Sequence, residues 1–169
     1  MRAIVIGAGI GGLSAAVALK KAGIDCTVFE AVKEMKPVGA AISIWPNGVK
    51  CMQHLGMGDI IETYGGPMRF MAYKDHRRGD TLTRFSLAPL VERTGGRPCP
   101  VSRTELQREM LNFWGHENVQ FGKRVESVRE DAAGVTVTFT DGTTATGDFL
   151  IAADGSHSAD RPYVLCPTP

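Results

Sequence analysis

Near its N-terminus the chain reads Ala3-Ile4-Val5-Ile6-Gly7-Ala8-Gly9-Ile10-Gly11-Gly12, and this stretch decides the fold. The run 3–6 is short, wholly apolar and followed by glycine, which is typical of a buried parallel strand. Residues 10–22 favour a helix that ends at Gly23, and a second apolar strand follows at 26–30. A strand, a helix and a strand within this length form a right-handed unit whose strands are parallel, so the sequence predicts an α/β fold.

The glycines of this stretch satisfy the pattern G-x-G-x-x-G at Gly7, Gly9 and Gly12. In dinucleotide-binding folds the first glycine allows a tight turn, the second lets the backbone approach a pyrophosphate, and the third lets helix and strand pack closely. The pyrophosphate would lie at the N-terminus of helix 10–22, where unpaired N–H groups and the helix dipole favour an anion. Glycine-rich turns without a ligand are common, but this one stands between a strand and a helix, as the motif requires.

Glu30 ends the second strand, at the position where an acidic side chain accepts hydrogen bonds from a ribose diol. The alternative is a strand-end carboxylate that faces only water. Together with the glycines, Glu30 favours a dinucleotide site. A glutamate in place of a basic residue argues against a 2′-phosphate, so FAD or NAD fits better than NADP.

The rest of the chain predicts further helices, paired strands and one antiparallel three-strand meander at 123–148. Asp141-Gly142 is a tight-turn signal inside that meander. Residues 88–100 contain three prolines and two adjacent glycines, so we expect an irregular connection there. The predicted elements are helices at 46–55, from 59, and at 102–114, and strands at 67–73, 81–85, 119–121, 124–129, 135–140, 143–148 and 149–153.

Length and composition exclude several classes of function. With 169 residues the chain suits one domain, or one domain and a fragment of a second. An apolar content of 43%, a charged content of 22% and a net charge of +1 favour neither nucleic acid nor an anionic membrane as partner. The glycines at 7–12 would break a signal peptide, and no other stretch could span a bilayer. The four cysteines are scattered, which favours the reducing cytoplasm and no metal site.

Two further motifs select among dinucleotide-binding families. Arg103 opens the helix predicted at 102–114, and the segment 154–161 has the form D-G-x-x-S-x-x-R after an apolar strand. With the glycine motif, these marks resemble the class A flavoprotein monooxygenases, the para-hydroxybenzoate hydroxylase-like group. The resemblance covers Met1 to about Leu165. The stretches 38–48 and 97–103 look most like the flavin-dependent urate hydroxylases of that group.

The resemblance implies an FAD site and a role for each of its residues. No residue of the chain is predicted to be a catalytic acid, base or nucleophile, and none a metal ligand. Gly11 and its neighbours Gly7, Gly9, Gly12 and Leu13 would bind the pyrophosphate, and Glu30 with Ala31 would bind the adenosine ribose. Ser43 would lie near the ribityl–isoalloxazine side, Arg103 would contact the phosphate or ribityl oxygens, and Val125 would line the adenine pocket. Asp154 would contact the ribityl chain, and the group also ties Asp154-Gly155 to pyridine-nucleotide use.

The resemblance also implies a fold and an activity. The fold is a glutathione-reductase-type parallel sheet with the meander, in which 1–165 form the FAD-binding domain, about 67–100 belong to the substrate side and 166–169 form an irregular tail. In this group NADH or NADPH reduces FAD, and the flavin then activates O2 to hydroxylate an aromatic or purine substrate. In the most similar enzymes the substrate is urate and the product 5-hydroxyisourate. Asp160 departs from the group, which has an apolar residue at that place.

Other functions stay open at this point. The chain could be a non-catalytic dinucleotide-binding fragment, or part of a monooxygenase that acts on another aromatic ring. Arg103 and the Asp154 segment argue against an NAD-dependent dehydrogenase. Enzymes of the group are longer, so the substrate domain is expected to be largely missing. We therefore expect the chain alone to be inactive and to self-associate through strands within 67–85.

Overall fold

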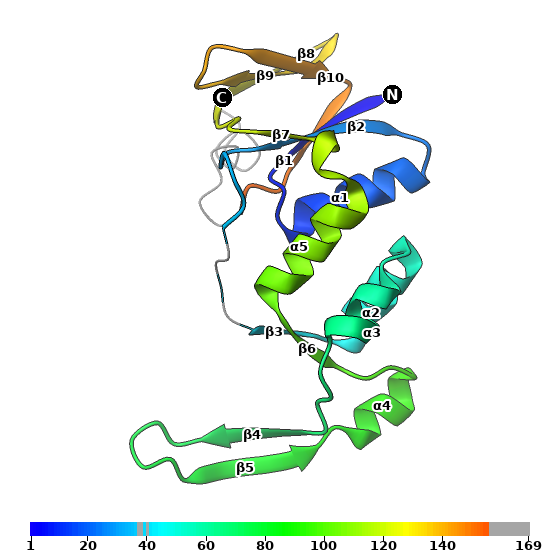
Figure 1. The fold of residues 1–169 in the computed structure, drawn as a ribbon, viewed down its shortest axis with the longest axis vertical. Coiled ribbons are helices and arrows are strands. Elements are labelled where there is room, and N and C mark those ends of the chain that lie inside the picture. The colour runs from blue at the N-terminus through cyan, green and yellow to red at the C-terminus, as the bar shows by residue number, and fades with distance from the viewer. Residues whose placement is uncertain (37–38, 40, 156–169) are drawn as a thin grey trace. The chain divides into compact units, whose positions relative to one another are not determined.

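The computed structural model describes residues 1–36, 39 and 41–155. The chain divides into two compact units (Figure 1). The first unit contains Met1–Pro37 and Gln107–Pro169, and the second contains Val38–Leu106.

The first unit is built on a four-stranded parallel sheet with the strand order β11-β1-β2-β7. Helix α1 (Ile10–Lys21) connects β1 to β2, as the sequence predicted. β1 is central, and its residues 3–6 are all buried because the sheet is covered on both faces. The strands are β1 (Arg2–Ile6), β2 (Asp25–Glu30), β7 (Val119–Phe121) and β11 (Phe149–Ala152).

One face of this sheet is covered by the predicted antiparallel meander, whose strand order is β10-β9-β8. Side chains from both layers interlock, and the rings of Phe29 and Phe139 lie with their centroids 4.8 Å apart. The apolar cluster between the layers consists of Ile4, Ile6, Phe29, Val125, Val135, Val137 and Phe139. The strands of the meander are β8 (Val125–Asp131), β9 (Gly134–Phe139) and β10 (Thr144–Gly147).

Helix α1 covers the opposite face of the parallel sheet (Figure 1). Its Leu13, Ala16 and Val17 are buried, and they share one side of the helix because they are spaced three to four residues apart. Since successive side chains of a strand alternate between faces, Ile4 and Ile6 point to the meander while Ala3 and Val5 point to the helical layer.

The second unit combines two short antiparallel sheets with helices. Strands β3 (Ala41–Ile44) and β6 (Cys99–Ser102) pair with each other, and β4 (Phe70–Lys74) pairs with β5 (Thr81–Ser86). Its buried side chains include Val49, Met52, Met57, Ile61 and Val101. The helices of this unit are α2 (Pro46–Leu55), α3 (Gly58–Tyr64) and α4 (Ala88–Thr94). The first turn of α5 (Arg103–Trp114) also belongs to it, and the rest of α5 belongs to the first unit, as does the short 3-10 helix η1 (His116–Asn118).

The prediction of an irregular connection at 88–100 is wrong. This segment forms α4 and the start of β6. Pro89 stands in the first turn of α4, where its missing N–H has no helical partner to lose, and Gly95 ends the helix at φ +66°. Pro100 lies in β6, which pairs with only one strand, so a proline is tolerated there. Pro89 and Pro100 therefore occupy helix and strand positions that are compatible with proline, and they do not indicate an irregular segment.

The other predicted elements are confirmed within a few residues at their ends. The basic run His76-Arg77-Arg78 lies at the exposed tip of the β4–β5 hairpin. Asp75 shapes this tip, since its Oδ1 accepts hydrogen bonds from the N–H groups of Arg77 and Arg78 at 3.0 and 2.8 Å. In the part of the chain that the structure describes, no helix has both the length and the apolar character needed to cross a bilayer.

An exposed ion pair closes the β9–β10 turn. The Nζ of Lys123 lies 2.7 Å from Oδ2 of Asp141 and also donates to the hydroxyl of Thr143. The hydrogen bond from Lys123, followed by those from Thr143, holds the pKa of Asp141 well below its usual range. Because the folded-state pKa is lowered, this interaction stabilises the fold above the unfolded pKa of about 4 and is lost as pH falls toward the folded value.

Lys123→Met should therefore lower the melting temperature near pH 7 and lower it less at about pH 2, where the aspartate's contribution is already shrinking. Thermal unfolding followed by circular dichroism across this pH range measures the difference. Lys74→Met, which removes an exposed lysine from the hairpin, is the matched control. A loss for Lys123→Met that is the same at every pH would contradict the role of the ion pair.

Candidate functional site

The carboxyl ends of β1, β2 and β11 lie next to one another at one edge of the parallel sheet. Gly7 follows β1, Glu30 ends β2, and Asp154 stands two residues after the end of β11. Ligands of open α/β sheets bind outside the carboxyl ends of the strands. The structure thus brings the glycine loop, Glu30 and Asp154 together at this edge.

Gly7 and Gly12 are glycines because the backbone is crowded around them. Gly7 has φ +99°, its N–H donates to the carbonyl of Phe29 at 2.7 Å, and a Cβ there would lie 2.5 Å from the carbonyl oxygen of Ala153. A Cβ at Gly12 would overlap the carbonyl oxygen of Gly7. Helix α1 can begin directly against the ends of β1 and β11 only because both side chains are absent.

Gly9 and Gly11 differ from these two, since, apart from the adjacent residues and the nearby helix backbone, no heavy atom of the described residues lies within 4 Å of where their Cβ atoms would be. Gly9 is the N-cap of α1, and the first turn of the helix carries no acidic side chain. The N–H groups of such a turn have no carbonyl partner within the helix. Open space beside unpaired backbone donors is what an approaching phosphate needs, so these glycines fit the predicted pyrophosphate site.

Glu30 also has a role that the sequence reading missed. Its Oε2 accepts a hydrogen bond from the N–H of Ala8 at 2.7 Å, and its Oε1 accepts one from the N–H of Val32 at 3.0 Å. The half-buried carboxylate therefore braces both the glycine loop and the turn that contains Ala31. A carboxylate has about four acceptor positions, so two remain for the hydroxyls of a ribose.

Gln107 is a second contact that sequence reasoning missed. Its side-chain amide donates to the carbonyl of Ala8 at 3.1 Å. The signal that could have found it is helical spacing, because position 107 belongs to the same stripe of α5 as the buried Met110, Leu111 and Trp114. A polar side chain such as Gln107 in an apolar stripe needs a hydrogen-bond partner inside the protein, because burying it without one costs free energy.

Asp154 lies just beyond β11, and its Oδ1 is shielded from solvent. The backbone N of Asp154 would lie 3.1 Å from a Cβ at Gly7, so this residue adjoins the glycine loop. Gly155 has φ +91° and is exposed, with open space around it. The rest of the D-G-x-x-S-x-x-R segment, including Asp160, lies outside the described residues, as do Val38 and Ala40 of the stretch 38–48.

Arg103 and Ser43 belong to the second unit, and their part in the site stays a prediction. Arg103 is the exposed first residue of α5, and its side chain lies beside Gly39, where a Cβ would come within 3.1 Å of Cδ of the arginine. Ser43 is exposed on β3, opposite Pro100 of β6. Both side chains are accessible to a ligand.

Val125 opens β8, and its side chain lies in the apolar cluster between the sheet and the meander. It is 9% exposed and packs in one cluster with Phe29 and Phe139. Its contact with an adenine ring stays a prediction. Because the side chain is occupied by this packing, we expect the backbone of Val125 to make that contact.

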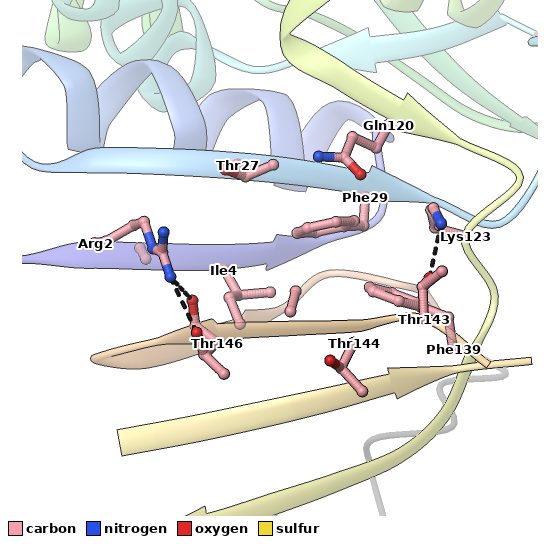
Figure 2. A pocket seen from close by; sticks show the side chains of 12 residues that line it. Arg2, Ile4, Thr27, Phe29, Gln120, Lys123, Phe139, Thr143, Thr144 and Thr146 are labelled. Carbon is pink, nitrogen blue, oxygen red and sulfur yellow. Dashed lines mark hydrogen bonds between the residues drawn. The ribbon is translucent and has the colours of Figure 1, made fainter. Parts of the chain in front are cut away.

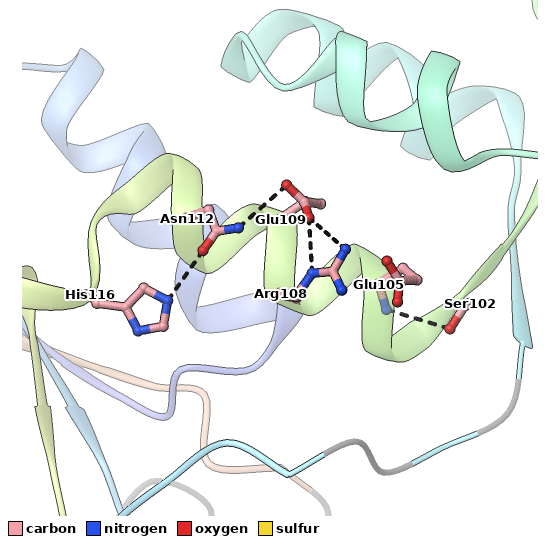
Figure 3. A network of polar contacts seen from close by, with 6 residues as sticks. All are labelled: Ser102, Glu105, Arg108, Glu109, Asn112 and His116. Carbon is pink, nitrogen blue, oxygen red and sulfur yellow. Dashed lines mark hydrogen bonds and ion pairs between the residues drawn. The ribbon is translucent and has the colours of Figure 1, made fainter.

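Polar side chains of α5 and of the residues flanking it form two groups of contacts (Figure 3). At the start of the helix the N–H of Glu105 points to the hydroxyl of Ser102 at 3.4 Å, as in a helix N-cap. Further along, Glu109 pairs with Arg108 at 2.9 Å and accepts from Asn112, which contacts His116 at 3.2 Å. These contacts link neighbouring turns of the helix and the residue that follows it.

A hollow of about 430 Å³ lies between the parallel sheet and the meander (Figure 2). Four of its polar side chains already bond within the fold, Arg2 to Thr146 and Lys123 to Thr143. Its described lining residues include none of the predicted cofactor-binding positions. Among the described residues, moreover, no three His, Cys, Asp or Glu side chains gather as metal ligands would. The sheet edge is the better candidate site.

Comparison with known proteins identifies the family of the chain. The family model of the FAD binding domain matches residues 1–167. The FAD-dependent urate hydroxylase of Klebsiella pneumoniae is 76% identical over the whole chain, and that of Mycolicibacterium vanbaalenii is 47% identical over 98% of it. The chain spans 44% and 42% of the length of these two proteins.

Solved structures agree with this assignment. The crystal structure of Klebsiella pneumoniae HpxO complexed with FAD and uric acid superposes with a TM-score of 0.91 at 74% identity. The match covers 100% of this chain and 43% of that one. The predicted parallel sheet with its antiparallel strands is therefore confirmed both by the structure and by its neighbours. From its family model, its relatives and its fold, the chain belongs to the FAD binding domain family, whose cofactor is FAD.

Proposed function

We propose that this chain is the FAD-binding part of a flavoprotein monooxygenase that hydroxylates urate to 5-hydroxyisourate, with NADH or NADPH as reductant and O2 as co-substrate. The observation that carries the proposal is the 76% identity, over all 169 residues, to a FAD-dependent urate hydroxylase. Since the chain spans less than half of that protein, the activity of the whole enzyme is inferred and a different aromatic substrate is the alternative.

The residues of the sheet edge fit FAD. The open backbone at Gly9 and Gly11 would receive the pyrophosphate, and the N-terminus of α1 adds favourable dipole charge without an acidic side chain to oppose it. The two remaining acceptor positions of Glu30 would take the adenosine ribose, with Ala31 beside it. Gly7 and Gly12 would keep the loop close to the strand ends, and Leu13 would anchor the first turn in the core.

The remaining predicted positions would complete the site from other elements. Arg103 would place a guanidinium near the phosphate or ribityl oxygens, where a charge-assisted hydrogen bond is strong. Ser43 would lie near the isoalloxazine end, Val125 near the adenine, and Asp154 near the ribityl chain with Gly155 next to it. Bound FAD supplies the redox and oxygen chemistry, and the protein supplies position and exclusion of water. None of these residues is proposed as a catalytic acid or base.

We also propose 1–165 as the FAD-binding domain, with about 67–100 on the substrate side, and a cytoplasmic location. The free cysteines among the described residues suit a reducing compartment.

The substrate assignment can be tested with a chimera. In it, this chain replaces the matched N-terminal part of the Klebsiella pneumoniae urate hydroxylase. We expect a yellow protein that oxidises urate with NADH. The reaction is measured by the loss of urate absorbance and by O2 consumption. Gly12→Glu, which fills the contact with Gly7, should abolish both flavin binding and turnover. A chimera that binds FAD but leaves urate untouched would point to another aromatic ring. By contrast, we expect the 169 residues alone to bind FAD weakly or not at all and not to hydroxylate urate.

Glu30→Ala and Arg103→Ala should each lower the affinity for FAD about tenfold to hundredfold, because each removes one set of hydrogen bonds to the ligand that contributes about 1–3 kcal/mol. Fluorescence titration of FAD into the same chimera measures the change. Glu34→Ala and Arg93→Ala remove exposed charges of the same kind from nearby positions and should leave the affinity unchanged. Unchanged affinity for both test variants would refute these site assignments.

The 169 residues are further expected to self-associate through the β4–β5 hairpin. Phe70, Tyr73, Leu82 and Phe85 are 50%, 54%, 69% and 42% exposed there, and a two-stranded sheet leaves both outer edges unpaired. Light scattering after size exclusion should show dimers or larger species, and Leu82→Lys should reduce them. Ala88→Lys adds the same charge outside the hairpin and should not. A monomeric unchanged chain would disprove the prediction.

A further inference from the structure

The peptide groups of Ala8 are held from two sides. Its N–H donates to Oε2 of Glu30 at 2.7 Å, and its carbonyl accepts from Nε2 of Gln107 at 3.1 Å. The two partners come from different elements, the end of β2 and the second turn of α5. Ala8 itself is fully buried, so water cannot replace either partner. The residue between Gly7 and Gly9 therefore has both of its backbone hydrogen bonds determined by side chains.

Holding this carbonyl also sets the direction of the next amide. The carbonyl of Ala8 and the N–H of Gly9 belong to one planar peptide group, and in a trans peptide they point in opposite directions. The described peptide bonds are all trans. With Gln107 on the carbonyl side, the N–H of Gly9 is turned to the other side. Gly9 is the N-cap of α1 and has open space where a Cβ would lie.

Glutamine suits this position better than the alternatives. Leucine or methionine at 107 would continue the apolar stripe of Met110 and Leu111 but would leave the Ala8 carbonyl buried without a donor. Glutamate has no donor when ionised, and it would place a negative charge beside a pyrophosphate. The neutral amide satisfies the carbonyl without changing the charge of the site.

From this geometry we propose that Gln107 is a positioning residue for pyrophosphate binding. Its side-chain amide fixes the Ala8–Gly9 peptide so that the N–H of Gly9 faces the ligand. The inference rests on the proposed binding of FAD at the glycine loop, and it adds a residue of α5 that itself need not touch the cofactor.

The test uses the 169-residue chain and ADP, which carries the pyrophosphate, with adenosine, which lacks it, as the comparison ligand. Titrations are followed in ¹H–¹⁵N spectra, which detect weak binding. Gln107→Met should weaken ADP binding about fivefold to tenfold, the effect of one misdirected hydrogen bond, and leave adenosine binding unchanged. The Gly9 amide resonance should shift in the free variant. Gln53→Met, an exposed glutamine of α2, is the matched control and should change neither.

A rescue separates positioning from simple loss of packing. Gln107→His keeps a neutral ring N–H donor at similar reach and should bind ADP more tightly than Gln107→Met. If Gln107→Met does not fold, Gln107→Asn keeps the amide but ends one methylene short, and the same split between ADP and adenosine is expected.

The outcomes distinguish this inference from the proposed function. ADP binding by Gln107→Met equal to that of the unchanged chain would overturn the positioning role alone. Equal weakening of ADP and adenosine would also overturn it, because general damage to the fold affects both ligands. An unchanged chain that binds neither ligand would overturn the inference, whereas the proposed function is tested separately by the chimera.

Discussion

The contact between Gly12 and the carbonyl of Gly7 is the constraint on which the site depends. With a side chain at either position, helix α1 could not begin against the ends of β1 and β11. Because it does begin there, its unpaired N–H groups point toward the carboxyl edge of the sheet. The same close approach buries Ala8, and a buried peptide must find partners for both its N–H and its carbonyl. Glu30 and Gln107 are these partners.

The carboxylate of Glu30 thus stabilises the glycine loop and also belongs to the proposed ligand site. It bonds to Ala8 and Val32 within the fold, and it retains acceptor positions for a ribose. A substitution at Glu30 consequently acts on the ligand directly and also on the shape of the loop that holds the pyrophosphate. The two effects are separable at Gln107, which contacts the loop from the side of α5.

The rigidity of this edge comes from the layers on either side of the sheet. β1 and β2 are covered by the meander through Phe29 and Phe139 on one face and by Leu13 of α1 on the other. Burial on both faces is what a parallel sheet requires, and it explains why residues 3–6 are apolar without alternation. Strand ends held in this way position the glycine loop within small limits.

Local sequence determined the elements and the family. Apolar runs ending in glycine, the spacing of Gly7, Gly9 and Gly12, and Asp141-Gly142 predicted strands, loop and hairpin, because each depends on a few adjacent residues. The prolines of 88–100 led to the wrong prediction of an irregular connection, because a proline is also compatible with the first turn of a helix and with an edge strand. Only the tertiary structure decided that Gln107, ninety-nine residues along the chain from Ala8, would hold its carbonyl. Helical spacing places Gln107 in an apolar stripe of α5 but does not identify Ala8 as its partner, because packing and not chain spacing brings residues of distant elements together.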